Sequence, residues 1–353
     1  MISPQKIIFC IYYLAISIAF IVGSFWLLLS SQTLLTFLFS VCLLLILTTP
    51  FIFIIKGKVN KKYLIFLGIF IISLLPFWFQ QNNAISWNFK LVSLSSEKYN
   101  YNILNIIQEK ELLSVGIKFA WILDISYSEI DSFVKKLYEY EKNIEINLPS
   151  QIPNALINKK EQKYILYTPK SSKKDELIIV LNGSAGWFLF YQKFFKQFWD
   201  AHQTQIVTPI FWWGNWYESG GVELIYKTYY DLIEKWNILP NTKVTLIWVS
   251  NGWTGLSRAV AYDENNIFTK IVFISWVMES DIIENNFFQE NAQEKSFYVI
   301  HGMKDKAVAY DYFLKVQKSF PKLQTLIFEN GDHYILLNEQ TKIIKEIHNI
   351  LNE

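Results

Sequence analysis

The sequence predicts an α/β protein with a mainly parallel sheet, covered by helices on both faces and preceded by transmembrane helices. From residue 163 onward, apolar runs of strand length alternate with segments of helical pattern. Five consecutive aliphatic residues at 177–181 indicate a strand buried on both faces, which is typical of a parallel sheet. Long uncharged stretches near the start of the chain predict the membrane region.

Three uncharged stretches occupy residues 7–29, 33–55 and 63–79. A bilayer core needs about 20 apolar residues per helix, so the first two stretches are long enough to cross and the third is near the lower limit. The alternative for the first stretch is a cleaved signal peptide, whose apolar run is shorter, roughly 7–15 residues. We expect residues 1–80 to form a transmembrane region of about three helices.

The lysines around these stretches predict how the chain is oriented. Lys56, Lys58, Lys61 and Lys62 lie between the second and third stretches. Because positively charged loops stay in the cytoplasm, three spans would place the rest of the chain outside it. We therefore expect an integral, multi-pass membrane protein whose catalytic domain is extracytoplasmic. If the third stretch does not cross, the catalytic domain is cytoplasmic instead.

The charge of the remaining chain argues against a nucleic-acid partner. Residues 1–88 contain five lysines and no acidic residue, while the whole chain carries a net charge of +2. The remainder is therefore mildly acidic, unlike a protein that binds a polyanion. Both cysteines, Cys10 and Cys42, lie in the uncharged stretches, so we expect no disulfide in the rest of the chain.

Residues 81–162 form a connecting or accessory region without a clear fold. Within it, apolar side chains at 130, 133, 134 and 137 follow helical spacing after Ser128, a residue type that favours helix starts. Such a stripe most often packs on a neighbouring domain. A membrane-facing helix or a lid over an active site are the alternatives.

Residues 163–353 form the predicted catalytic domain, in which strands and helices alternate. Strands are predicted at 164–168, 177–181, 205–210, 244–249, 271–275, 296–300 and 325–328. Helices are predicted at 188–199, 222–236, 310–319, from the turn after residue 250 to about 262, and in a closing segment that ends near 351.

Three polar residues follow predicted strands in the order nucleophile, acid, base. Ser250 ends one strand, Asp305 follows the strand that reaches residue 300, and His333 follows the strand at 325–328. Because the carboxyl ends of parallel strands meet at one edge of a sheet, these side chains are expected to meet there. A serine, a histidine and an acid in this order indicate a hydrolase that forms an acyl-enzyme.

Two motifs carry a resemblance to a known family. Residues 248–252 read Trp-Val-Ser-Asn-Gly, and residues 301–305 read His-Gly-Met-Lys-Asp. With these motifs, residues 163–353 resemble the α/β-hydrolase fold family, whose nucleophile lies in GxSxG and whose acid closes an HGxxD run. Trp248 departs from the family pattern, since that position is usually small. A second frame would place Gly252 at the nucleophile position and leave no nucleophile.

The resemblance implies further roles at this edge of the sheet. The backbone N–H groups of Ser184 and Asn251 would form the oxyanion hole, and His301 would be a structural residue at a strand end. Asp281 and Asp332 remain alternative acids. Four tryptophans near the predicted site could line an apolar substrate pocket, or could serve as core or membrane-interface packing. These are Trp187, Trp212, Trp213 and Trp253.

The expected function is that of a membrane-anchored serine hydrolase acting on a carboxylic ester or a related, small or lipid-like acyl substrate. Peptidase, thioesterase and acyltransferase activities use the same triad on the same fold. The alternative from another class is a non-catalytic membrane protein that uses a degenerate hydrolase scaffold for binding. The four histidines lie far apart without ligand spacing, so we expect no metal and no cofactor. The sequence does not predict an oligomeric state.

Overall fold

The computed structural model describes residues 89–94, 162–169, 174–183, 203–211, 218–235, 237–250, 253–276, 280–333 and 335–353, together with Glu109, Phe194, Trp216 and Met278. The chain divides into two compact units, and the sheet lies within the unit formed by residues Ile85–Asn100 and Glu139–Glu353. That unit is the one described below.

Eight strands form one sheet in the order β1-β2-β4-β3-β5-β6-β7-β8. They are β1 (Phe89–Ser93), β2 (Lys163–Tyr167), β3 (Glu176–Leu181), β4 (Gln205–Ile210), β5 (Lys243–Val249), β6 (Phe268–Ile274), β7 (Ser296–Gly302) and β8 (Leu323–Phe328). Strand β2 pairs antiparallel with both β1 and β4, and the remaining pairs are parallel. The predicted mainly parallel sheet is therefore confirmed, and its order with a single reversed strand is that of the α/β-hydrolase fold.

The strands predicted between residues 164 and 328 are confirmed with ends that differ by a few residues. Strand β1 was not predicted, because it lies in the region 81–162, for which the sequence pattern indicates no clear fold. Its residues pair in register with β2, from Phe89 opposite Tyr167 to Ser93 opposite Lys163. Only Phe89 of this strand is buried, so the single-sided apolar pattern of an edge strand was too weak to identify it.

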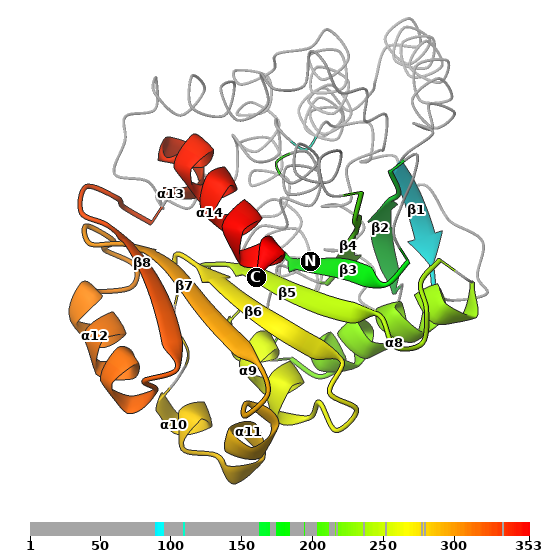
Figure 1. Cartoon of the computed structure of the whole chain (residues 1–353), viewed down its shortest axis with the longest axis horizontal. Coiled ribbons are helices and arrows are strands. Elements are labelled where there is room, and N and C mark those ends of the chain that lie inside the picture. The colour runs from blue at the N-terminus through cyan, green and yellow to red at the C-terminus, as the bar shows by residue number, and fades with distance from the viewer. Residues whose placement is uncertain are drawn as a thin grey trace, which may run out of the picture. The chain divides into compact units, whose positions relative to one another are not determined.

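Helices cover both faces of the sheet (Figure 1). They are α8 (Gly221–Glu234), α9 (Trp253–Ala261), α10 (Ser280–Ile283), α11 (Asn286–Asn291), α12 (Tyr310–Ser319), α13 (Ile335–Asn338) and α14 (Gln340–Asn352). Figure 1 shows α14 on one face and α8, α9 and α12 on the other. All six residues of β5 from Val244 to Val249 are buried, as expected for a strand with helices on both sides.

Alternate residues of each strand serve different faces, since side chains in a strand point to opposite sides. Leu246 and Trp248 of β5 belong to the large apolar core that includes Leu224 of α8 and Leu256 of α9. The closing helix α14 buries Ile343, Ile347 and Ile350 in a row at i, i+4 and i+7. That spacing places the three side chains on one face of the helix, against the sheet.

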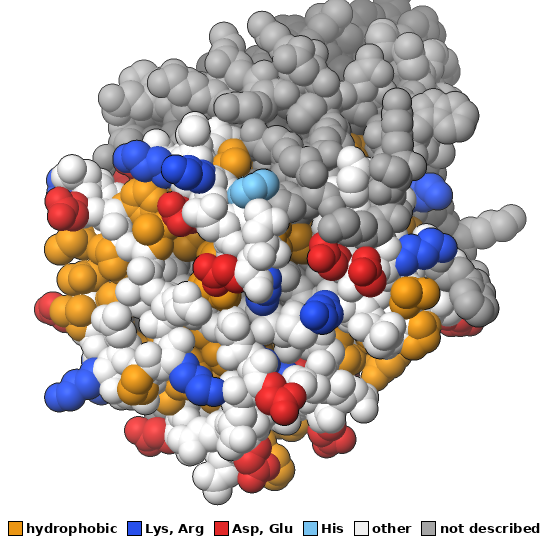
Figure 2. Space-filling view, viewed as in Figure 1, with side chains coloured by type: hydrophobic (Ala, Val, Ile, Leu, Met, Phe, Trp, Pro, Cys, Tyr) orange, Lys and Arg blue, Asp and Glu red, His pale blue; other side chains and the backbone are white. Residues whose placement is uncertain are grey.

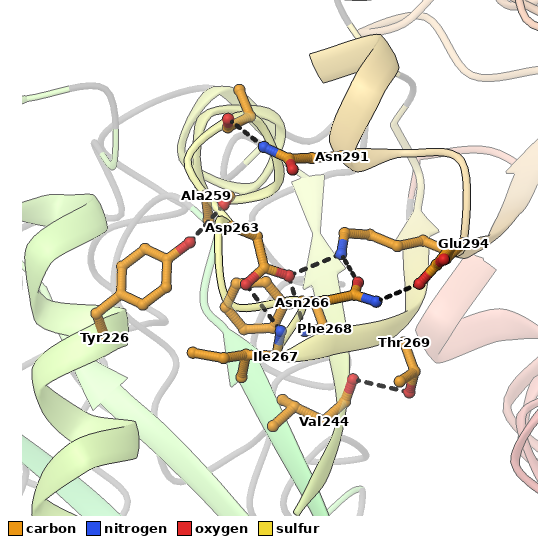
Figure 3. A network of polar contacts seen from close by, with 12 residues as sticks. Tyr226, Val244, Ala259, Asp263, Asn266, Ile267, Phe268, Thr269, Asn291 and Glu294 are labelled. Carbon is orange, nitrogen blue, oxygen red and sulfur yellow. Dashed lines mark hydrogen bonds and ion pairs between the residues drawn. The ribbon is translucent and has the colours of Figure 1, made fainter. Parts of the chain in front are cut away.

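A buried ion pair stabilises the loops at the amino-terminal ends of β6 and β7 (Figure 3). Lys295 Nζ lies 2.8 Å from Asp263 Oδ2, and neither side chain is exposed to solvent. The Asp263 carboxylate also accepts backbone N–H bonds from Ile267 and Phe268, at 2.8 and 2.9 Å. The buried charges are thus paired and hydrogen-bonded, as burial requires. This network lies at the end of the sheet opposite the edge where the predicted site residues follow their strands.

The membrane region predicted from the sequence stays a prediction. In the part of the chain that is described, no helix is both long and apolar enough to cross a membrane. The predicted spans at 7–29, 33–55 and 63–79 lie outside that part. On the face of the described unit seen in Figure 2, acidic and basic side chains are interspersed.

Candidate active site

Ser250 directly follows β5, and α9 begins three residues later at Trp253. Its φ angle is +56°, which is the left-handed region that residues with a Cβ rarely adopt. Holding a residue there costs about 1–3 kcal/mol, and such strain is common where a side chain has a function. A strained turn from a strand into a helix exposes a nucleophile at the top of an α/β sheet. The backbone of Ser250 therefore has the conformation that the predicted role requires.

Two glycines bring the loops after β7 and β8 together. A Cβ on Gly302 would collide with the backbone of Gly331, and one on Gly331 would collide with the Ile335 and Phe328 side chains. The backbones can therefore approach closely, and Lys304 N donates to Gly331 O at 2.8 Å. Asp305 follows the first glycine by three residues and His333 follows the second by two, so this contact places the two side chains next to each other.

Ser250, His333 and Asp305 form one chain of hydrogen bonds. The distance from Ser250 Oγ to His333 Nε2 is 2.7 Å, and that from His333 Nδ1 to Asp305 Oδ2 is 2.8 Å. The His333 side chain retains 14% of its surface exposed, whereas that of Asp305 is fully buried. If Nδ1 donates to the carboxylate, Nε2 presents its lone pair to the serine hydroxyl. The arrangement can therefore remove a proton from Ser250.

The second carboxylate oxygen of Asp305 is held by the backbone. Asp305 Oδ1 accepts hydrogen bonds from Ala307 N and Val308 N, each 2.8 Å long. These bonds satisfy the buried charge and fix the rotation of the carboxyl group. As a consequence, Oδ2 is directed to His333.

His301 is buried next to this carboxylate and outside the hydrogen-bonded chain. Its Nε2 lies 3.1 Å from Val308 O, so this nitrogen carries the proton and donates it. Its Nδ1 lies 4.0 Å from Asp305 Oδ2, and its ring stacks on Phe313 at 5.5 Å. Burial lowers the pKa of His301 below the usual histidine value, although the charge of Asp305 opposes the shift. The location agrees with the structural role expected from the sequence.

Trp248 is accommodated without displacing the nucleophile turn. The indole is fully buried, and its Nε1 donates to the backbone oxygen of Ser250 at 3.1 Å. This position is usually small in the family that the sequence resembles, but here the ring packs into the core that contains Leu224 of α8 and Leu256 of α9.

Trp276, just after β6, was missed by the sequence analysis. Its ring meets that of His333 edge to face, at 6.4 Å and 83°. The available signal was its position directly after the predicted strand at 271–275, at the same edge of the sheet as the other site residues.

Asp305, and not the alternative acid Asp332, is the carboxylate bonded to His333. The Asp332 carboxylate accepts bonds from Asn338 Nδ2, at 3.2 and 3.3 Å, while Asp305 occupies His333 Nδ1. Asp281 belongs to α10, and its side chain lies outside the described part.

Several predicted site residues also lie outside the described part of the chain. They are Ser184, Asn251, Gly252, Trp187, Trp212 and Trp213, and of Trp253 only its place as the first residue of α9 is described. The described end of β3 does reach the site. A Cβ on Gly183 would lie 2.7 Å from Val249 O and 3.1 Å from Ser250 Cβ. Residue 184, expected to supply an oxyanion donor, follows this contact directly.

Among the described residues, no group of three or more His, Cys, Asp or Glu side chains is placed to hold a metal ion. The hydrogen-bonded chain from Ser250 to Asp305 needs no such ion for proton transfer.

Comparisons with known proteins give structural likeness only. No protein-family model matches the chain, and no curated protein sequence matches it. A thermostable esterase is similar over 48% of this chain and 52% of its own, with 15% identity and a TM-score of 0.39. Est1E from Butyrivibrio proteoclasticus is similar over 53% and 93%, with 13% identity and a TM-score of 0.41. A 2,6-dihydroxy-pseudo-oxynicotine hydrolase is similar over 69% and 80%, with 13% identity and a TM-score of 0.43. These overlaps are partial, so the fold assignment rests on the strand order of the chain itself.

Proposed function

We propose that this protein is a serine hydrolase that cleaves a carboxylic ester or a related acyl substrate through an acyl-enzyme intermediate. The observation that carries the proposal is the hydrogen-bonded chain Ser250–His333–Asp305, with distances of 2.7 and 2.8 Å. Its first member has a left-handed backbone at the carboxyl end of β5. A base within hydrogen-bond reach of a strained serine, itself oriented by a buried acid, is the arrangement that activates a serine hydroxyl.

In the proposed reaction, Ser250 Oγ attacks the acyl carbonyl while His333 Nε2 takes its proton. Asp305 keeps the Nδ1 proton on His333 and stabilises the imidazolium that forms. His333 then gives its proton to the leaving alcohol, and an acyl group remains on Ser250. A water molecule, activated by the same histidine, attacks the acyl group and releases the acid. The backbone N–H groups of Ser184 and Asn251 are the proposed donors to the oxyanion.

A small or lipid-like acyl substrate is the proposed partner. Trp276 presents an aromatic ring beside His333, and Trp187, Trp212, Trp213 and Trp253 are proposed to extend this apolar lining. Apolar walls with a few polar groups are typical of pockets for such ligands. The mildly acidic charge of the chain after residue 88 does not suit a nucleic-acid partner.

We further propose that the protein is held in a membrane by helices at 7–29, 33–55 and 63–79, with the hydrolase unit on the extracytoplasmic side. The support is the sequence: the length of the uncharged stretches, and the four lysines between the second and third of them. A reporter that works only outside the cytoplasm, fused after Glu353, should be active. A reporter signal confined to the cytoplasm would refute the three-span arrangement.

The experiment that tests the activity is labelling with a fluorophosphonate probe, followed by mass spectrometry of the labelled peptide. The wild type should be labelled at Ser250, and Ser250→Ala should not be labelled. Ser275→Ala is a matched control, because Ser275 is also a serine with a positive φ, +55°, at the end of the adjacent strand β6. It should be labelled as the wild type is. A folded wild type that the probe does not label would instead favour the non-catalytic binding scaffold.

A further inference from the structure

The pairing between β3 and β5 ends just before the residues that form the site. The last pair in this ladder is Leu181 with Trp248. Beyond it lie Asn182 and Gly183, which follow β3, Val249, which is the last residue of β5, and Ser250 after it. The two segments lie close together within this unpaired stretch, since a Cβ added to Gly183 would lie 3.1 Å from Ser250 Cβ. No pair of the β3–β5 ladder spans this stretch, although β5 pairs with β6 on its other side up to Val249 opposite Ile274.

Two indole N–H groups donate to backbone oxygens beyond the end of the ladder. Trp216 Nε1 donates to Asn182 O at 3.0 Å, and Trp248 Nε1 donates to Ser250 O at 3.1 Å. One bond thus holds the end of β3 and the other holds the nucleophile itself. Because a hydrogen bond requires both distance and alignment, each restricts where its carbonyl can lie.

The two rings are themselves held in place. They meet edge to face, with centroids 5.8 Å apart, and both are buried, with exposed fractions of 1% for Trp216 and 0% for Trp248. Trp216 is seated against α8 and α9 by glycines, since a Cβ on Gly255 would collide with its side chain and one on Gly221 would lie 2.5 Å from its backbone oxygen. Edge-to-face contact is a favoured arrangement of aromatic rings. The rings therefore connect the two strand ends through a rigid, buried contact.

We propose that Trp216 and Trp248 are positioning residues, whose paired indoles hold the nucleophile turn of Ser250 at a fixed spacing from the end of β3. This inference rests on the proposed function. The end of β3 leads directly into residue 184, the proposed oxyanion donor, so the pair sets the distance between the nucleophile and the oxyanion site. A misplacement of about 1 Å between reacting groups can lower a rate on the order of 100-fold. The tryptophan that departs from the usual small residue is thus a part of the site's support.

The test compares three single substitutions that each remove one aromatic donor. Trp248→Phe and Trp216→Phe keep an aromatic ring but lose the N–H group. Tyr229→Phe is the matched control, because the Tyr229 hydroxyl donates to Pro240 O at 2.9 Å, before the amino-terminal end of β5 and far from the triad. For each purified variant, the melting temperature, the rate of fluorophosphonate labelling at Ser250, and kcat and KM with a short-chain aryl ester are measured.

We expect Trp248→Phe to reduce the labelling rate and kcat by about 10- to 100-fold, with KM changed less than about threefold. Trp216→Phe should reduce both rates in the same direction. Tyr229→Phe should lower the melting temperature by a few degrees, about as much as losing one hydrogen bond does, and leave both rates at the wild-type level.

Two results would separate this inference from the proposed function. Wild-type protein that is not labelled contradicts the proposed function, whatever the tryptophan variants do. Wild-type protein that is labelled, with Trp248→Phe labelled within twofold of it, contradicts the positioning role alone and leaves Trp248 as core packing. If Trp248→Phe does not fold, Trp216→Phe gives the same decision, because it loses the bond to Asn182 O while Ser250 O remains paired.

Discussion

Replacing Asp305 by Asn should almost abolish turnover, and the structure gives the reason. Asp305 Oδ1 is held by two backbone donors, Ala307 N and Val308 N, at 2.8 Å each. An amide oxygen can accept these two bonds, whereas an amide nitrogen cannot. The amide of the Asp305→Asn variant is therefore locked with its nitrogen in the place where Oδ2 now meets His333 Nδ1, at 2.8 Å.

That exchange replaces a hydrogen-bond acceptor by a donor, and the His333 imidazole therefore changes to its other tautomer. Facing an N–H group, His333 Nδ1 must present its lone pair, and the proton moves to Nε2. The nitrogen that lies 2.7 Å from Ser250 Oγ can then no longer accept the serine proton. In triads that lose the orienting acid in this way, kcat falls by about 10⁴-fold, which corresponds to about 5.4 kcal/mol of transition-state stabilisation.

The assay is hydrolysis of a short-chain aryl ester at about pH 7, with Asp332→Asn as the matched control. Asp332 lies next to His333 in the chain, and its carboxylate bonds to Asn338, so its loss should change kcat less than tenfold. The reasoning is refuted if Asp305→Asn retains more than a tenth of wild-type activity while folded. It is also refuted if Asp332→Asn loses as much activity as Asp305→Asn.

Three further predictions concern strain, pH and the buried ion pair. Ser250→Gly and Ser250→Ala should both be inactive. The glycine variant should be more stable to urea than the alanine variant by about 1 kcal/mol, because only glycine adopts a φ of +56° without strain. Equal urea midpoints for the two variants would contradict this. Burial lowers the pKa of His301, so its unfolded form binds more protons, and wild-type stability should fall as pH drops below the unfolded value of about 6.5. A folded His301→Gln variant should show a smaller fall over that range, and urea-stability curves that are identical from about pH 7 to about pH 4.5 would refute the assignment. Lys295→Met should cost about 3–5 kcal/mol in urea denaturation, since it leaves the buried Asp263 charge without its partner, while kcat per folded molecule stays unchanged; a loss of kcat would connect this remote pair (Figure 3) to the site.

Most of the sheet could be predicted from sequence because its strands are buried on both faces. Runs such as 177–181 and 244–249 are buried along their whole length, which leaves little ambiguity once helical segments alternate with them. The geometry of a parallel sheet then brings the carboxyl ends of β5, β7 and β8 to one edge. That is why Ser250, Asp305 and His333, separated by up to 83 positions, could be expected to meet.

What could not be predicted depends on strand pairing, backbone hydrogen bonds and ring contacts that the residue types alone do not reveal. β1 becomes a strand by pairing with β2, and its own pattern of one buried residue in five does not distinguish it from a loop. The backbone N–H groups that donate to the Asp305 carboxylate belong to residues only two and three positions later, but the side chains of those residues do not indicate that these hydrogen bonds form. Trp276 was missed because an aromatic residue after a strand is far more often core than site.

Trp248 shows that the residue type usual at a motif position is not always required by the structure of the turn. The nucleophile turn requires a positive φ at the nucleophile and free space on the side where the oxyanion forms. The residue two positions before the nucleophile must be small only if its side chain points into that space. Trp248 lies in β5 and Ser250 follows the strand, and the Trp248 ring enters the core that contains Leu224 and Leu256. Its bulk is therefore accepted by the core, while its N–H reaches the Ser250 carbonyl. A large residue at this position is compatible with a nucleophile turn where its ring is buried in the core behind the sheet, as the Trp248 ring is here.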